Sequence, residues 1–449
     1  MLFDGKKIEF VLLEKLKGVD TKGWIFFAAA AVLAKAGYDV SVYEAKQRNE
    51  LGHDWEDRFS FDLLLSAVKA DKLPDDAWRY RGDCAFVSPD FKTKVVINYT
   101  DENRQKIMWR KPLINMLLDN AEKNGVKLNF GTEVTAPKIC GGRVAGLKTL
   151  VGDIESDLVI DAAGVFSPVR TKLPESFGIE KMPKRGDVFY AYRAYFNKTD
   201  SNMPEIPFEV YLCHAREQGL SWCCTNEDSV DILIGRIDPL NEKMLKHHID
   251  NFRKAHTYIG NEILHGGNYG IIPVRRPLAL MVADGYAAVG DSAFMTTPMN
   301  GMGIDLSLQA GKLLADTVIK NSGDASVETL WKYNRDFLIL YGGETAKNEG
   351  LKNALLNLPG EGVDFLFESA VIQASDLSGA GKNSDIGNLL GKFARGMKNP
   401  PYFFTILNGI MKGTVSAKLF KSAPEKYDRE KIIKWQNEIL RHVIKISRE

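Results

Sequence analysis

One stretch of the sequence combines residue types that can hold a planar ligand. Gly290 and Asp291 follow an apolar run, and Pro298 then precedes Gly301 and Gly303. An aspartate at the end of a strand can accept hydrogen bonds from a ligand hydroxyl, and glycines let the backbone approach a flat ring. A helix that begins near Gly303 would turn its N–H groups toward an anionic or electron-rich group. The spacing therefore predicts a ligand-binding loop between a strand and a helix.

The order of these residues, Gly-Asp-x6-Pro-x2-Gly-x-Gly, resembles the second FAD motif of a flavoprotein superfamily. That superfamily includes aromatic hydroxylases and geranylgeranyl reductases, and the resemblance extends over about residues 38–320. It implies that Gly290, Asp291, Pro298, Gly301 and Gly303 contact FAD. The alternative is a loop and helix cap with incidental glycines.

A second segment supports the same resemblance. Asp161 ends the apolar run Leu-Val-Ile, and Ala163 and Gly164 follow, with Arg170 further on. The segment is similar to the superfamily's central Asp-Gly motif, in the small-residue variant typical of geranylgeranyl reductase-like members. It implies that Asp161 and Gly164 lie near the cofactor and that Arg170 positions nearby loops. A turn or helix cap is the alternative role of Asp161.

Two further residues are predicted to bind the cofactor. Glu44 ends a predicted strand and lies 21 residues after Gly23, and a dinucleotide fold places an acid about 20 residues on, at the adenosine ribose. Arg110 opens a predicted helix, where an arginine of the relatives contacts the phosphate or ribityl region. A surface arginine on a first helical turn is the alternative.

The phosphate loop departs from the superfamily pattern. Residues 21–26 read Thr-Lys-Gly-Trp-Ile-Phe where relatives carry GxGxxG, so only Gly23 remains. Phe26 adds bulk where the third glycine lets the helix pack closely on the strand, and Lys22 supplies only a side-chain charge. The segment is either a divergent loop or locally scrambled, as a frameshift would produce. A cofactor-free relative that retains the fold is therefore one alternative.

The substrate side is marked by aromatic and titratable residues. Gly219 to Trp222 resembles the aromatic motif of geranylgeranyl reductases, whose tryptophan lines the lipid pocket, although Cys223-Cys224 replaces the usual Phe-Pro. Core packing is the alternative role of Trp222. His53, beside Asp54, is a candidate proton donor because histidine titrates near neutral pH. A capping or surface role of His53 is equally open.

The predicted elements place these residues in two interleaved architectures. Strands at 6–13 and 38–43 around a helix at 24–35 form a β-α-β unit, the start of a doubly wound sheet. Strands at 188–196, 208–212, 220–224 and 230–237 without intervening helices predict an antiparallel sheet. The fold class is thus α/β, a Rossmann-like FAD-binding domain interleaved with an α+β substrate domain. The FAD-binding domain is predicted to comprise residues 1–75, 105–180 and 278–325. The substrate domain is predicted to comprise residues 76–104 and 181–277, and residues 326–449 form a helical C-terminal region.

Composition narrows the function classes. The 449 residues exceed the roughly 250–300 over which a single hydrophobic core grows, so two or three domains are expected. The net charge of +1 argues against nucleic-acid binding. Five irregularly spaced cysteines predict no disulfide framework, no metal site and a cytoplasmic protein. An amphipathic helix predicted at 427–447 either lies on a membrane surface or packs on its own protein.

These observations predict an FAD-dependent oxidoreductase. In the favoured hypothesis, reduced FAD delivers hydride to a carbon–carbon double bond of an apolar, isoprenoid-like substrate, and NAD(P)H or ferredoxin supplies electrons. The first alternative is an FAD-dependent monooxygenase that uses NAD(P)H, and the second is the cofactor-free relative.

Overall fold

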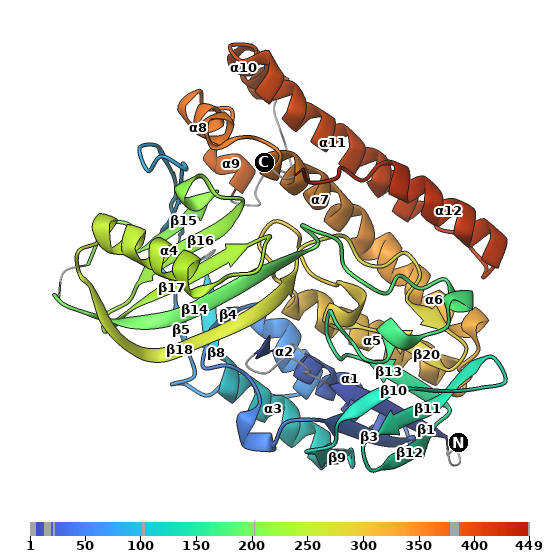
Figure 1. Cartoon of the computed structure of the whole chain (residues 1–449). Coiled ribbons are helices and arrows are strands. Elements are labelled where there is room, and N and C mark those ends of the chain that lie inside the picture. Colours follow the sequence, from blue (N-terminus) through green and yellow to red (C-terminus); the bar gives the residue numbers. More distant parts are fainter. Residues whose placement is uncertain are drawn as a thin grey trace.

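The computed structural model describes residues 6–12, 19–20, 23–100, 104–201, 203–377 and 386–447. Two large sheets lie side by side, and long C-terminal helices run along one flank of the molecule (Figure 1). The first sheet has the strand order β19-β20-β13-β1-β3-β9. Its strands are β1 (Lys7–Leu12), β3 (Asp39–Glu44), β9 (Lys127–Phe130), β13 (Leu158–Asp161), β19 (Val282–Ala283) and β20 (Tyr286–Ala288). This confirms the predicted β-α-β start.

The parallel core of this sheet explains its apolar strands. β1 pairs in parallel with both β3 and β13, so that Phe10 lies between Val42 and Ile160. Helices cover the sheet, and a parallel strand covered on both faces is apolar along its length. These helices are η1 (Gly23–Phe26), α1 (Phe27–Lys35), α3 (Arg110–Lys123) and α5 (Ile304–Lys320).

The second sheet has the order β2-β18-β14-β17-β16-β15-β6-β7 and is mostly antiparallel. This confirms the predicted mixture of architectures, whereas the exact domain boundaries stay a prediction. The strands are β2 (Val19–Asp20), β6 (Cys84–Val87), β7 (Lys94–Ile97), β14 (Val188–Lys198), β15 (Phe208–Leu212), β16 (Gly219–Thr225), β17 (Ser229–Arg236) and β18 (Ile259–Pro273). Helix α4 (Glu242–Ala255) covers one face.

The small sheet β4-β8-β5 joins these two halves. Its strands are β4 (Glu56–Arg58), β5 (Trp78–Tyr80) and β8 (Lys106–Trp109). A separate meander is formed by β10 (Val134–Cys140), β11 (Arg143–Thr149) and β12 (Gly152–Glu155). Helix α2 (Phe61–Val68) follows β4.

The C-terminal part is helical, as predicted from residue 327 onward. Its elements are α6 (Val327–Phe337), α7 (Gly343–Leu356), α8 (Gly360–Glu368), α9 (Ala374–Leu377), α10 (Ile386–Gly396), α11 (Pro400–Lys421) and α12 (Arg429–Arg441). The helix predicted at 427–447 was too long, because residues after Arg441 leave the helix and pack on the protein: Asn353 donates to the Ile444 carbonyl at 2.8 Å.

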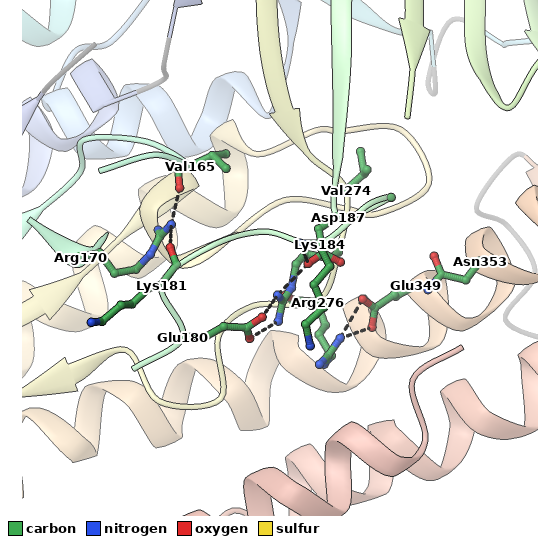
Figure 2. Close-up of polar contacts among 12 residues, drawn as sticks. Val165, Arg170, Glu180, Lys181, Lys184, Asp187, Val274, Arg276, Glu349 and Asn353 are labelled. Carbon is green, nitrogen blue, oxygen red and sulfur yellow. Dashed lines mark hydrogen bonds and ion pairs between the residues drawn. The ribbon is translucent and has the colours of Figure 1, made fainter. Parts of the chain in front are cut away.

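A buried ion pair of Glu349 and a buried lysine fasten α7 to the segment after β18 (Figure 2). Arg276 donates to both carboxylate oxygens of Glu349 at 2.9 Å, and Arg275 pairs with Glu180 at 2.7 Å. Lys352 donates from a buried site to the Val274 carbonyl at 2.6 Å. These bonds fix the helical C-terminal part against the end of β18.

Glu9 is an unusual acid in the central strand β1. Its side chain is buried, and its Oε2 has no hydrogen-bond partner among the described residues. Burial and, secondarily, Asp39 raise the pKa of Glu9 to about 8. Because the folded form binds the proton more tightly, stability should fall as pH rises from about 4.5 to about 8, by up to about 1.4 kcal/mol per pH unit.

Glu9→Leu is therefore expected to flatten this dependence and to stabilise the protein at the alkaline end of the window. Urea unfolding at several pH values measures it. Glu262→Leu, on the exposed part of β18, is the matched control and should keep the parent's pH dependence. A parent protein whose unfolding free energy does not fall across the window would contradict the assignment.

Candidate functional site

A cavity of about 1930 Å³ lies where the two sheets and the C-terminal helices meet. The ligand loop borders it through Asp291, Gly301 and Gly303, and apolar side chains of the second sheet and of α7 and α11 form its body. Arg110 and Trp222, both predicted from sequence, also line it. The site residues Gly23, Glu44, His53, Asp161, Gly164, Gly290 and Pro298 lie outside its lining.

The loop at Gly290 folds back sharply before α5. Gly290 has φ +58° and begins the short helix η6 (Gly290–Ala293), and the Met295 N–H donates to the Gly290 carbonyl at 2.9 Å. A second turn joins Thr297 to Gly301, whose φ of +68° favours glycine. A Cβ at Gly301 would lie 2.6 Å from Ile272. The backbone is thus held at the cavity wall beside the first turn of α5.

Buried polar groups hold this loop from below. Asp161 is fully buried and accepts hydrogen bonds from Ser167 at 2.6 Å and from Tyr286 at 2.8 Å, which ties β13 to β20. Arg170, also fully buried, donates to the carbonyl oxygens of Ser292 and Val165. In the structure Asp161 and Arg170 therefore position the loop, as the resemblance implied for Arg170, and contact of Asp161 with a cofactor stays a prediction.

Arg110 lies at the junction of β8 and α3. Its guanidinium binds Asp57 through two hydrogen bonds of 2.6 and 2.9 Å and lies 5.0 Å from the Trp55 ring and 5.8 Å from the Trp24 ring. The side chain is almost fully buried. A cation held in this way is oriented along the cavity wall, where it can face an anionic or polar ligand group.

The residues fit a flavin better at one end than at the other. Asp291, the glycines and the start of α5 offer the acceptor, the close backbone and the donors that a ribityl chain and ring need. At the expected phosphate end, Phe26 stands where relatives carry the third glycine, and its ring packs against Gly290, where a Cβ would lie 2.6 Å away, and near Gly311. Glu44 is buried at the end of β3 and accepts from the Lys46 N–H at 2.9 Å. Gly23 is buried in η1, and Lys22 lies outside the described residues.

A buried ion pair supports the substrate side of the cavity. Arg193 on β14 binds Asp231 on β17 through bonds of 2.8 and 2.7 Å, and both are at most 3% exposed. Trp222 on β16 donates from Nε1 to the same carboxylate at 3.2 Å and is half-buried. The pair thereby sets the orientation of the tryptophan. Charged residues at inward positions of two apolar strands were the sequence signal for this pair.

His53 lies just before the cavity-lining Trp55. Its Nε2 is 3.0 Å from the Tyr269 carbonyl oxygen, and its ring centroid is 4.8 Å from that of Trp55. Because a carbonyl only accepts, Nε2 donates in this contact. A proton-donor role of His53 therefore stays a prediction.

Among the cavity residues that the sequence did not predict are Arg58 and Arg81. Neither belongs to a recognisable motif, and β4 and β5 bring them to the wall only by pairing with β8. Among the described helices, none combines the length and apolar character that crossing a bilayer requires.

Comparisons with known proteins find similarity to FAD-dependent enzymes. The family model of FAD-dependent oxidoreductases matches residues 110–317. A digeranylgeranylglycerophospholipid reductase of Sulfolobus acidocaldarius is 23% identical over 81% of this chain and 82% of its own. The enzyme of the same name from Methanothrix thermoacetophila is 27% identical over 78% of this chain and 89% of its own.

Solved structures share the fold. A geranylgeranyl bacteriochlorophyll reductase-like protein of Thermoplasma acidophilum superposes with a TM-score of 0.69 and 18% identity, over 90% of this chain and all of the other. A probable FAD-dependent monooxygenase of Pseudomonas aeruginosa gives a TM-score of 0.56 and 17% identity, over 78% and 97% of the two chains.

Proposed function

We propose that the chain, an FAD-dependent oxidoreductase similar to geranylgeranyl reductases, reduces carbon–carbon double bonds of an isoprenoid lipid. The observation that carries the proposal is the large apolar cavity that opens directly onto Asp291, Gly301 and Gly303. Relatives named digeranylgeranylglycerophospholipid reductases match most of this chain, and their name supports an isoprenoid lipid as the substrate class. Bound FAD would supply the hydride for such a reduction.

The protein's own residues would bind the cofactor, orient the substrate and exclude water from the site. Asp291 would accept a hydrogen bond from the ribityl chain, and the first turn of α5 would face the ring. Arg110 would bind the polar part of the cofactor, while Trp222 and the apolar wall would hold the substrate chain. A closed apolar site strengthens these polar contacts because water does not compete for them.

Membrane contact is part of the proposal. Exposed apolar side chains on α10 and α11 include Phe393, Phe404 and Met411, and Phe393 also lines the cavity. A cytoplasmic protein that rests this face on a bilayer could receive a lipid chain without passing it through water. NAD(P)H or a ferredoxin would supply the electrons.

Anaerobic turnover tests the function. The purified full chain is incubated with FAD, a chemical reductant and vesicles that carry geranylgeranyl lipid, and the lipid is analysed by mass spectrometry. Gain of two hydrogens per reduced double bond is expected, together with reoxidation of the flavin. The same incubation with NAD(P)H or ferredoxin in place of the reductant identifies the donor.

Other outcomes separate the alternatives. Oxygen uptake that depends on an aromatic substrate and NAD(P)H would support the monooxygenase instead. A protein that stays colourless and does not quench flavin fluorescence after incubation with FAD would support the cofactor-free relative and would overturn both enzyme assignments.

A further inference from the structure

Two arginines face the cavity without an acidic partner. Arg58 ends β4 and is exposed at the rim of the cavity, where its Nη1 lies 3.9 Å from the Met302 sulfur. Arg81 follows β5, is 7% exposed, and its buried Nε has no hydrogen-bond partner. Within the described ranges, neither guanidinium lies within ion-pair distance of a carboxylate. Partial desolvation and the like charge of Arg81 lower the pKa of Arg58, while Tyr99 and Asp305 oppose this shift.

Each of the other described cations of the cavity wall is paired with a carboxylate. Arg110 binds Asp57, and Arg193 binds Asp231. At the far side, Lys347 and Lys392 lie near carboxylates of α7 and α9. Of the two acids on β4, Asp57 is the one that binds Arg110, and Glu56 is bound by Arg79 at 2.7 Å. Among the described cations of the wall, only Arg58 and Arg81 therefore lack an ion pair, although the carboxylate of Asp305 acts on Arg58 from beyond ion-pair distance.

The surroundings of the two arginines suit a small anion. The Arg81 guanidinium lies 4.4 Å above the Phe208 ring, which fixes its plane. Gln105 donates to the Tyr99 hydroxyl, and both side chains line the same part of the cavity. Arginine presents a rigid fork of donors that matches phosphate oxygens, and a buried cation without an ion pair, as at Arg81, is costly.

We propose that Arg58 and Arg81 form the subsite for the phosphate group of an amphiphilic ligand whose apolar chain fills the rest of the cavity. The inference rests on the proposed function, because it names the head group of that substrate. Apolar side chains continue from this subsite along the second sheet, through Phe189 and Leu220, to Leu355 on α7 and Ile406 on α11. One cavity thus offers a cationic surface for the phosphate group and an apolar surface for the hydrocarbon chain of the ligand.

The phosphate has two conceivable sources, a lipid head group or a free phosphate ion. Binding of three probes distinguishes them: dodecyl phosphate below its micellar concentration, dodecanol and inorganic phosphate. Trp55 and Trp222 line the cavity, so tryptophan fluorescence reports binding, with calorimetry as the second readout. The full chain is used, and its flavin content is recorded in each sample by visible absorbance.

Dodecyl phosphate is expected to bind at least about tenfold more tightly than dodecanol, and inorganic phosphate only weakly. Arg58→Gln and Arg81→Gln should each weaken the binding of dodecyl phosphate about tenfold and leave the affinity for dodecanol unchanged. Arg81→Lys, which keeps the charge, should lose less of the affinity for dodecyl phosphate. Thermal melting checks that each variant is folded. Arg104→Gln is the matched control, because Arg104 is exposed and lies against Tyr80.

Equal binding of dodecyl phosphate and dodecanol would overturn the subsite. So would a preference that persists in folded Arg58→Gln and Arg81→Gln proteins, or a loss of flavin in these variants with the preference intact. Tight binding of inorganic phosphate alone would assign the arginines to a free ion. Because the preference is measured without turnover, it can hold when lipid reduction fails, and it can fail when reduction succeeds.

Discussion

Asp231→Asn is expected to destabilise the protein by about 3–5 kcal/mol, because it leaves the charge of Arg193 buried and uncompensated. Both hydrogen bonds of the Arg193–Asp231 pair are at most 2.8 Å, and both residues are almost fully buried. Urea unfolding measures the loss. The fluorescence of Trp222 should also change, since its Nε1 donates to the altered group.

Glu361→Gln serves as the control for this variant. It removes the acid of the Arg216–Glu361 pair, whose side chains are 51% and 59% exposed. Exposed pairs contribute about 0–1 kcal/mol, so this protein should unfold nearly like the parent. A loss below about 1 kcal/mol in Asp231→Asn would show that the buried pair is not needed for stability.

Asp291→Ala is expected to weaken FAD binding by roughly 10–150-fold, since a hydrogen bond to a charged group contributes about 1.5–3 kcal/mol. Asp291 borders the cavity beside Gly303, and a Cβ on that glycine would lie 3.7 Å from its Oδ1. Titration of flavin fluorescence gives the dissociation constant. The variant should unfold in urea close to the parent if its role is in binding.

The control lies on the helix that follows the loop. Asp316 on α5 is partly exposed and pairs with Lys312, four residues earlier. Asp316→Ala should bind FAD like the parent. An Asp291→Ala protein with unchanged FAD affinity would remove Asp291 from the cofactor site, whatever the substrate proves to be.

Local patterns predicted the elements that position the cofactor site. The apolar run of β1, the alternation of β3 and the helix after Gly303 each follow from residues that are neighbours in sequence. The strand β18 was not predicted, because Gly266 and Gly267 interrupt its pattern. Both have φ above +70°, and the pairing with β14 shifts register there. A Cβ at Gly266 would lie 2.9 Å from the Arg193 carbonyl oxygen.

The cavity wall was harder to predict than the ligand loop. Trp222 was identified because a family motif surrounds it, whereas Arg58 and Arg81 reach the wall through pairing with β8. Arg110 was predicted to contact the cofactor, but its partner Asp57 lies 53 residues away in sequence. Such pairings depend on long-range strand contacts, which residue type and spacing do not encode.

The order of strands in the first sheet has a consequence for synthesis. β1 pairs with β13, so that Ile8 meets Leu158, and β13 in turn pairs with β20 at Tyr286. A nascent chain on the ribosome can pair β1 with β3 early, but the edge of β1 that faces β13 stays unpaired while about 150 further residues emerge, at roughly 5–20 residues per second. For several seconds this segment is a target for chaperones, and conditions that slow translation would prolong its exposure.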